Sequence, residues 1–241
     1  MSYALLFPGQ GSQSVGMSGA HQAPVIGATL REASDILGWN LAALVAEGPA
    51  EELNRTEKTQ PALLAASVAL WRLWQAQDLP PPAALAGHSL GEYSALVAAG
   101  SLDFGDALKL VELRGQLMQA AVPAGTGGMT AVVGLEDAAV AELCRACPDG
   151  LLEPANFNAP GQVVVAGERR ALDWLDAHGK SHGARMVKRL AMSVPSHCTL
   201  MRAASAGLAS ALADVEVPQL DDAWIRTPID AFILAKLREH G

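Results

Sequence analysis

Ser89 lies in a sequence pattern that is typical of a catalytic nucleophile. The stretch from Gly87 to Gly91 reads Gly-His-Ser-Leu-Gly and fits the pattern Gly-x-Ser-x-Gly. In this pattern a strand turns sharply into a helix, and small flanking residues let the strained backbone lift the serine hydroxyl clear of the sheet. An expected strand at 83–87 precedes the serine, and a helical pattern follows it from about Leu90. The residues therefore predict a nucleophilic serine, with an ordinary glycine turn as the alternative.

The same turn is expected to supply part of an oxyanion hole. Backbone N–H groups at the start of a helix have no acceptor within the helix, and the first one after the serine belongs to Leu90. A second donor must come from another loop, and the glycine-rich segment Phe7 to Gln13 is the obvious candidate. This segment lacks the Gly-Lys-Ser/Thr ending of a nucleotide-binding loop and the Gly-x-Gly-x-x-Gly spacing of a dinucleotide turn. It is therefore not predicted to bind phosphate.

An arginine interrupts the apolar face of a predicted helix. The helix follows Asp103, which is expected to cap its N-terminus, and Arg114 lies in the middle of the core face. The apolar members of that face are Ala107, Leu110, Val111, Leu117, Met118 and Ala121. A guanidinium directed at the interior needs a partner, and a planar carboxylate matches its geometry best. The residues leave open whether Arg114 extends to solvent, pairs with an internal carboxylate, or binds the carboxylate of a substrate.

Short apolar runs alternate with longer helical patterns, one of which begins at Pro61. This alternation indicates an α/β domain with a mostly parallel sheet. From Gly128 the pattern changes to β-α-β-β-α-β, a split βαβ unit of ferredoxin-like type. The unit is expected to end near Ala191, so it would be inserted between Ser89 and His197.

Composition and charge limit the classes of function. The chain has 241 residues, of which 50% are hydrophobic, and a net charge of −8. It can therefore bury a sizeable core, and its field should repel nucleic acid and anionic membranes. No apolar run approaches the roughly 18 residues that a membrane-spanning helix needs, and the N-terminus has no basic signal-peptide region. A cytoplasmic protein without nucleic-acid or membrane partners is expected.

The three cysteines do not indicate a disulfide framework or a metal site. Cys144 and Cys147 form a Cys-x-x-Cys pair, but the pair falls at the end of a helical pattern, whereas a redox pair begins a helix. No second pair of cysteines and no paired histidines complete a zinc-binding set. We expect these cysteines to be structural and the protein to hold no metal.

Together, these segments resemble the malonyl-CoA:acyl carrier protein transacylase family. The resemblance is carried, in chain order, by FPGQGSQ at 7–13, GHSLGEYSALVAAG at 87–100, ELRGQLMQ around Arg114, FNAPGQVVVAG at 157–167 and VPSHC at 194–198. A set of motifs in this order and at workable separations is highly specific.

The resemblance implies a two-part architecture. An α/β-hydrolase-like large subdomain with a parallel sheet would comprise residues 1–123 and 192–241, and an inserted ferredoxin-like small subdomain would comprise 124–191. It also implies fatty acid biosynthesis as the setting, with malonyl-CoA as donor and the phosphopantetheine thiol of an acyl carrier protein as acceptor. No cofactor is implied.

The resemblance further implies a role for each site residue. Ser89 would attack the thioester, and His197 would take its proton and later activate the incoming thiol. The N–H groups of Gln10 and Leu90 would hold the oxyanion, and Arg114 would bind the malonyl carboxylate. His197 comes from the resemblance alone, because a loop histidine before a cysteine has no distinctive spacing.

A basic cluster lies in the predicted small subdomain of this acidic chain. It consists of Lys180, Arg185, Lys188 and Arg189. These side chains are expected either to steer an acidic carrier protein or to form an ordinary solvated face.

The likeness is expected to stop near Pro218. A separate helix is predicted from Thr227, so the chain would be a C-terminally truncated or altered member of the family. Two alternatives remain: a serine hydrolase or thioesterase of the α/β-hydrolase type, and a truncated chain without catalytic activity. A hydrolase would need an acid between Ser89 and His197, where the candidates fall in the predicted small subdomain.

Overall fold

The computed structural model describes residues 3–19, 23–77, 79–123, 125–190, 192 and 194–213. The chain divides into two compact units. Described residues up to Gly115, together with those from Leu208 onward, form the first unit, and Gln116–Gly207 form the second. The helix predicted from Thr227 lies outside the described residues. The subdomain borders expected from the resemblance, 123/124 and 191/192, remain predictions.

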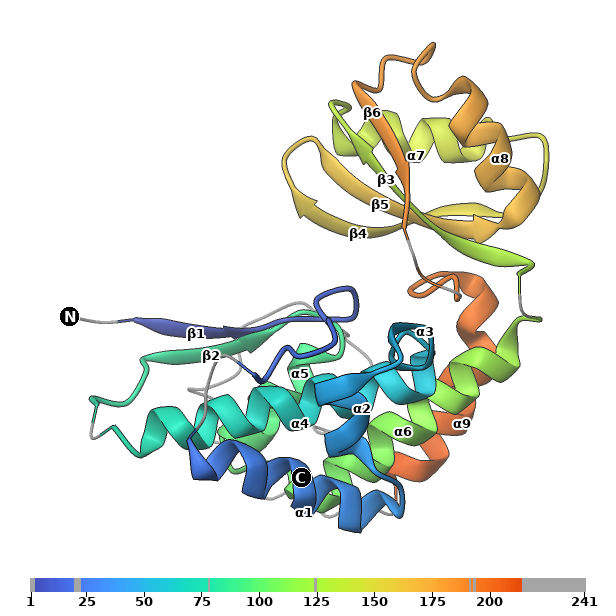
Figure 1. Ribbon diagram of the computed structural model, residues 1–241. Coiled ribbons are helices and arrows are strands. Elements are labelled where there is room, and N and C mark those ends of the chain that lie inside the picture. Colours follow the sequence, from blue (N-terminus) through green and yellow to red (C-terminus); the bar gives the residue numbers. More distant parts are fainter. Residues whose placement is uncertain are drawn as a thin grey trace. The chain divides into compact units, whose positions relative to one another are not determined.

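The first unit contains a pair of parallel strands. Strand β1 (Ala4–Phe7) runs beside β2 (Ala84–Gly87), with Phe7 opposite Gly87 (Figure 1). The surrounding helices are α1 (Pro24–Leu37), α2 (Leu41–Glu47), α3 (Ala50–Leu53), α4 (Thr56–Gln75), α5 (Gly91–Ala98) and the first part of α6 (Phe104–Ala121). Helix α5 packs against both strands and against α4. The α/β class and the parallel pairing expected from the sequence are confirmed.

Helix α6 begins where the sequence predicted. The Asp103 side chain accepts hydrogen bonds from the N–H groups of Gly105 at 2.7 Å and Asp106 at 3.1 Å, so it caps the helix. Ala107 and Val111 on the predicted core face are fully buried. The helix thus presents the face that carries Arg114 to the interior.

Helix α4 begins at Thr56, earlier than the pattern starting at Pro61 indicated. Pro61 is inside the helix, where its missing N–H removes one hydrogen bond near the N-terminal end. The side chain of Thr59 donates to the carbonyl oxygens of Leu53 at 2.6 Å and Arg55 at 3.0 Å, which fastens this first turn to the preceding loop. The earlier start places Gln60 within the helix.

The second unit contains a four-stranded antiparallel sheet in the order β4-β5-β3-β6. Its elements are β3 (Gly127–Val133), α7 (Asp137–Arg145), β4 (Leu152–Ala159), β5 (Gln162–Glu168), α8 (Arg169–His178) and β6 (Met186–Arg189). The first and third strands of the segment are central, which confirms the predicted β-α-β-β-α-β unit of ferredoxin-like type.

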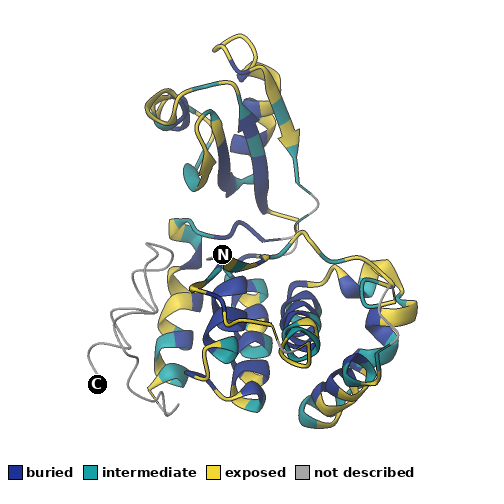
Figure 2. Ribbon diagram, turned by 90° about the vertical axis from the view of Figure 1, so that its left-hand side faces the viewer, coloured by how far each residue is buried: buried dark blue, intermediate teal, exposed yellow. Residues whose placement is uncertain are grey.

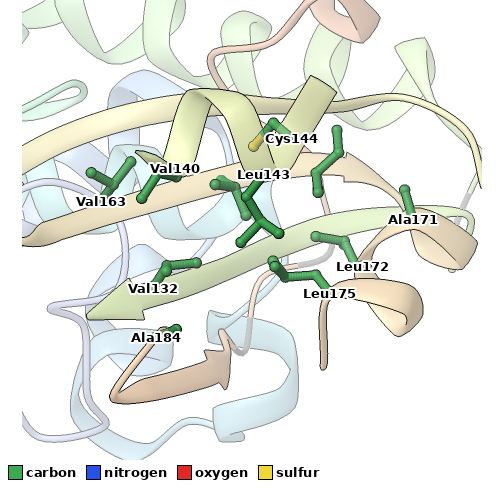
Figure 3. Close-up of a cluster of buried hydrophobic side chains, with 11 residues drawn as sticks. Val132, Val140, Leu143, Cys144, Val163, Ala171, Leu172, Leu175 and Ala184 are labelled. Atoms are coloured by element: carbon green, nitrogen blue, oxygen red, sulfur yellow. The ribbon is translucent and has the colours of Figure 1, made fainter. Parts of the chain in front are cut away.

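The core of the second unit lies between one face of the sheet and helices α7 and α8 (Figure 3). Val132 of β3 and Val163 of β5 are partners across the strands and share this face. They pack against Leu143 of α7 and Leu172 of α8, all with 4% of their surface exposed or less. The sheet and the two helices therefore form two layers that pack against each other.

A loop and two helical segments follow β6. They are the 3₁₀ turn η1 (Thr199–Met201) and helix α9 (Arg202–Leu212). Within the second unit, Val194 and Met201 bury their side chains against Met118 and Val122 at the end of α6. The segment around His197 is therefore anchored on both sides by apolar packing.

Many residues of the helices, and of the sheet in the second unit, are buried (Figure 2). In the first unit, by contrast, Leu6 of β1 has 78% of its surface exposed, and Phe7 and Gly87 are the buried residues of β1 and β2. In the part of the chain that the structure describes, no helix is long and apolar enough to cross a membrane.

Candidate active site

Ser89 occupies a strained turn between β2 and α5. Its φ is 53°, in a region that non-glycine residues rarely adopt. Among the non-glycine residues that the structure describes, only Ser89 and His197 have a positive φ. Such strain is concentrated at functional sites, where the surrounding structure enforces it. The sharp strand-to-helix turn predicted from the Gly-x-Ser-x-Gly pattern is thus present.

The glycines of the turn allow backbone segments to approach closely. A Cβ added at Gly87 would overlap the carbonyl group of Gly91, and one added at Gly91 would overlap the carbonyl oxygen of Phe7. A Cβ at Gly9 would lie 2.6 Å from the carbonyl oxygen of His88. The loop after β1 is therefore pressed against the serine turn at positions that only glycine can occupy.

Replacement Gly91→Ala is expected to destabilise the protein by about 3 kcal/mol or more, because the added methyl group must displace the backbone of β1. Thermal unfolding measures this loss. Gly27→Ala is the matched control, since its Cβ would approach only the flexible end of Arg31 within helix α1, and it is expected to leave stability unchanged or raised. Equal stability of the Gly91 variant and the native protein would contradict this close approach.

The two predicted oxyanion donors, Leu90 and Gln10, belong to the two segments in this contact: Leu90 to the serine turn and Gln10 to the loop after β1. Leu90 is buried and immediately precedes α5, so its N–H belongs to the start of that helix. Gln10 lies in the loop after β1, and its side chain donates to Oγ1 of Thr56 at 3.2 Å. Farther along the loop, Gln13 donates to Oδ1 of Asn54 at 2.8 Å. These bonds tie the loop that carries Gln10 to α3 and α4.

Arg114 reaches the serine from α6. It is 8% exposed, and its Nη2 donates to Oγ of Ser89 at 3.2 Å. Its Nη1 donates to Oε1 of Gln60 at 2.8 Å, and its guanidinium carbon lies 5.9 Å from the centre of the Tyr93 ring. Within the described residues, no aspartate or glutamate forms an ion pair with this side chain.

These contacts bear on the three interpretations that the sequence left open for Arg114. The side chain does not extend to solvent, and its contacts within the described residues are with a neutral amide, a hydroxyl and an aromatic ring. A buried cation without a counter-ion is unfavourable unless a ligand supplies the negative charge. The site is therefore suited to an anionic group positioned beside the serine hydroxyl.

His197 lies in the second unit, between Ser196 and η1, with a φ of 59°. Thr199, two residues after His197, forms two hydrogen bonds with Glu153 of β4. Oε2 of Glu153 accepts from the N–H of Thr199 at 2.7 Å, and Oε1 accepts from the Thr199 hydroxyl at 3.1 Å. Cys198 donates from Sγ to the carbonyl oxygen of Pro195 at 3.1 Å. The loop that carries His197 is thus held by Glu153 of β4 and by the hydrogen bond within its own turn.

Two residues that hold site residues, one in each unit, are not predicted from the sequence. Gln60 directly precedes the helical pattern that begins at Pro61, and Glu153 is a polar residue in an expected strand, where such residues are ordinarily solvated. For His197, backbone strain is a signal independent of the resemblance, but only the structure displays it.

The predicted basic cluster is partly engaged within the protein. Arg189 forms ion pairs with Asp173 at 2.8 Å and Asp176 at 2.6 Å, both on α8. Lys180, Arg185 and Lys188 are exposed. Steering of an acidic partner by this cluster stays a prediction, and it would rest mainly on the three exposed cations.

The thiol of Cys144 is packed in the core between α7, α8 and the sheet. Burial, with smaller contributions from Cys147 and Glu153, raises its pKa to about 12. Burial likewise raises the pKa of Cys198 to about 11, with the N–H of Leu200 opposing the effect. Since the thiolate is the reactive form, neither cysteine is suited to nucleophilic chemistry at neutral pH.

Alkylation by iodoacetamide at pH 8 is expected to be slow at both cysteines in the native protein. With a pKa of about 12, about one Cys144 thiol in ten thousand is ionised at this pH, against about a quarter for an unperturbed thiol. Peptide mass spectrometry of native and urea-unfolded samples measures the difference. Equal labelling in the two states would contradict the protected environment.

Comparison with known proteins identifies close relatives. Residues 4–229 match the acyl transferase domain family, so the match continues beyond Pro218, where the sequence analysis placed the end of the likeness. The malonyl CoA-acyl carrier protein transacylase of Salmonella typhimurium is 52% identical over 237 residues, which cover 95% of this chain and 77% of that protein.

Solved structures agree with the sequence match. The malonyl CoA-acyl carrier protein transacylase of Coxiella burnetii superposes with a TM-score of 0.89 at 42% identity, covering 99% of this chain and 79% of that one. A malonyl-transacylase in complex with its type II PKS acyl-carrier protein gives a TM-score of 0.89 at 48% identity, covering 99% and 81%.

Proposed function

Since the chain belongs to the acyl transferase domain family and, within it, to the malonyl CoA-acyl carrier protein transacylases, we propose that it transfers malonyl groups from malonyl-CoA to an acyl carrier protein. The acceptor is the phosphopantetheine thiol of the carrier protein, and the setting is fatty acid synthesis. Exchange of one thioester for another is nearly thermoneutral, so the enzyme needs only to divide it into two acyl transfers.

In the first transfer, Oγ of Ser89 attacks the thioester carbonyl while His197 takes its proton. The N–H groups of Gln10 and Leu90 stabilise the oxyanion of the tetrahedral intermediate. Collapse breaks the carbon–sulfur bond, and His197 returns the proton to the departing coenzyme A thiol. Ser89 is left carrying the malonyl group.

The second transfer repeats these steps in reverse. His197 takes the proton of the carrier-protein thiol, the sulfur attacks the malonyl-serine ester, and the proton returns to Ser89. Arg114 holds the free malonyl carboxylate throughout, so it orients the acyl group without joining the chemistry. No metal or cofactor has a part in this proposal.

The observation that supports this proposal most strongly is the hydrogen bond from Arg114 to Oγ of Ser89 at 3.2 Å. A buried guanidinium beside the nucleophile favours an acyl group that ends in a carboxylate. In a malonyl thioester the carboxylate and the reacting carbonyl are separated by one methylene group, which suits two protein groups in direct contact. The strained turns at Ser89 and His197 support their roles in the proposal.

The test is to incubate the protein with malonyl-CoA and a carrier protein bearing its phosphopantetheine arm, and to follow the mass of the carrier protein. The expected result is a gain of one malonyl group that requires the enzyme. Release of free malonic acid without any gain would instead favour the serine hydrolase considered from the sequence. A cytoplasmic location and the subdomain borders at 123/124 and 191/192 remain parts of the proposal.

A further inference from the structure

We propose that Glu153 of β4 is a positioning residue for the catalytic base, because it holds His197 in its strained backbone conformation by way of Thr199. The inference rests on the proposed malonyl transfer, in which His197 takes the proton of each attacking group. Glu153 does not contact the reacting atoms in this proposal, so its effect must pass through the loop that carries His197. The contacts that support the inference lie within the second unit.

Glu153 and the residue after His197 share one face of the four-stranded sheet. The partner of Glu153 across the strands is Ala166 of β5, whose own partner on β3 is Met129. Direct partners of antiparallel strands point to the same face of a sheet. Ala166 and Met129 are buried there in a cluster against which Cys198 packs. The carboxylate of Glu153 therefore lies on the face that the His197 loop covers.

Both carboxylate oxygens of Glu153 bond to one residue of this loop. Oε2 accepts from the N–H of Thr199 at 2.7 Å, and Oε1 accepts from its hydroxyl at 3.1 Å. Thr199 is the first residue of η1, and N–H groups at the start of a helical turn have no acceptor within it. The side chain of Cys198, at the capping position, makes no capping bond. Glu153 thus caps the turn from a strand 46 positions earlier.

This cap lies two positions after the strained histidine. His197 has a φ of 59°, and a non-glycine residue keeps such a conformation only where its surroundings enforce it. On one side of His197, Val194 is fully buried against Met118 and Val122. On the other side, Thr199 is held by the carboxylate. Without that hold the backbone would relax to a negative φ and displace the imidazole.

The charge of Glu153 also acts on the residue next to His197. Burial is the main cause of the raised pKa of Cys198, about 11, and the carboxylate of Glu153 raises this pKa further. The thiol therefore stays protonated and donates to the carbonyl oxygen of Pro195. Glu153 thus favours the observed turn after His197 by its hydrogen bonds and by its charge.

The test follows acylation of the enzyme by saturating malonyl-CoA, using intact mass in single-turnover experiments on the native chain, Glu153→Ala and Glu153→Gln. We expect Glu153→Ala to slow acylation by about 30-fold, because a displaced general base loses much of its effect. We expect Glu153→Gln to stay within about threefold of native, since its amide can accept from the Thr199 N–H and donate to the hydroxyl. The half-saturating concentration of malonyl-CoA should change by less than about twofold, because binding of the donor is not affected.

The decisive comparison repeats Glu153→Ala in a chain that already carries His197→Ala. If Glu153 acts through His197, removal of the carboxylate changes the remaining acylation rate by less than about twofold in this background. A carboxylate that only stabilised the fold would lower the rate by the same factor in both backgrounds, because independent effects multiply.

Two further variants complete the experiment. Thr199→Val removes the hydroxyl and keeps the N–H, so one of the two bonds remains and a loss of about threefold is expected. Glu142→Ala is the matched control, since it removes a carboxylate of the same unit that pairs with Arg145 at the surface of α7. Acylation of this control is expected to stay near the native rate.

Equal losses for Glu153→Ala in the native and the His197→Ala backgrounds would overturn the inference. A native acylation rate in Glu153→Ala would overturn it as well, and so would a loss in Glu153→Gln as large as in Glu153→Ala. If Glu153→Ala does not fold, Thr199→Val decides by the same comparison of backgrounds. Failure of the native chain to accept malonyl from malonyl-CoA is a different result, which would overturn the proposed function and this inference with it.

Discussion

Replacement of Ser89 by alanine is expected to abolish the malonyl adduct that malonyl-CoA leaves on the native protein. The hydroxyl is the only group that the proposed mechanism acylates, and the strained turn with φ 53° presents it at the start of α5. Intact-mass analysis after mixing with malonyl-CoA measures the adduct, and peptide mapping locates it.

Ser94→Ala is the matched control for this experiment. Ser94 is also a serine of the α5 region and is buried, with 1% of its surface exposed, but it is not at the turn. The control is expected to keep the adduct. An unchanged adduct on the Ser89 variant would refute the assignment of the nucleophile.

Arg114→Ala is expected to lower malonyl transfer by roughly 2 to 5 kcal/mol of transition-state stabilisation while sparing or improving acetyl transfer. The reason is that the guanidinium is buried next to Ser89, where the carboxylate of a bound malonyl group would supply the negative charge that none of the described residues provides in an ion pair. Steady-state kcat/KM values with malonyl-CoA and acetyl-CoA measure the two effects separately.

The control for this variant is Lys109→Ala. Lys109 lies on the same helix as Arg114, but its side chain is 67% exposed, and it pairs with Asp106, which is 50% exposed, at 4.0 Å. Surface pairs contribute little, so transfer of both acyl groups is expected to stay near the native rate. Equal losses for malonyl and acetyl groups in Arg114→Ala would show that the arginine is structural.

Local sequence signals were sufficient for much of the fold. The turn at Ser89 follows from two glycines whose added Cβ atoms would overlap neighbouring backbone, and such steric requirements are local. The start of α6 follows from the Asp103 cap, which involves residues at most three positions away. The β-α-β-β-α-β unit follows from hydrophobic periodicity, since its strands are short and its helices bury one face each.

Contacts between segments distant in the chain were not predictable in this way. Gln60 and Arg114 are 54 positions apart, and nothing in the local pattern of α4 indicates that its amide meets a guanidinium from α6. The presence of Arg114 in an apolar face is visible in the sequence, but its contacts with an amide, a hydroxyl and an aromatic ring are not. The bonds from Glu153 to Thr199, across 46 positions, likewise depend on the tertiary structure.

His197 could not be predicted from local sequence signals, for a different reason. A histidine in a loop has no characteristic spacing to a serine about a hundred positions earlier, because the order and separation of catalytic residues vary between folds. Only the family resemblance selected it from the six histidines of the chain. Its positive φ is a property of the folded backbone and has no counterpart in the sequence.

The central claim is that the malonyl group passes through the enzyme to a thiol rather than to water. A pulse-chase experiment tests this most directly: the malonyl-enzyme is formed with one equivalent of malonyl-CoA, freed of nucleotide, and mixed with carrier protein bearing its phosphopantetheine arm. Intact mass is then recorded for both proteins over time. The account predicts that the enzyme loses the malonyl mass while the carrier protein gains it, far faster than the adduct decays in buffer alone. Loss of the adduct at the same rate with and without the carrier protein, with malonic acid as the product, would contradict the account.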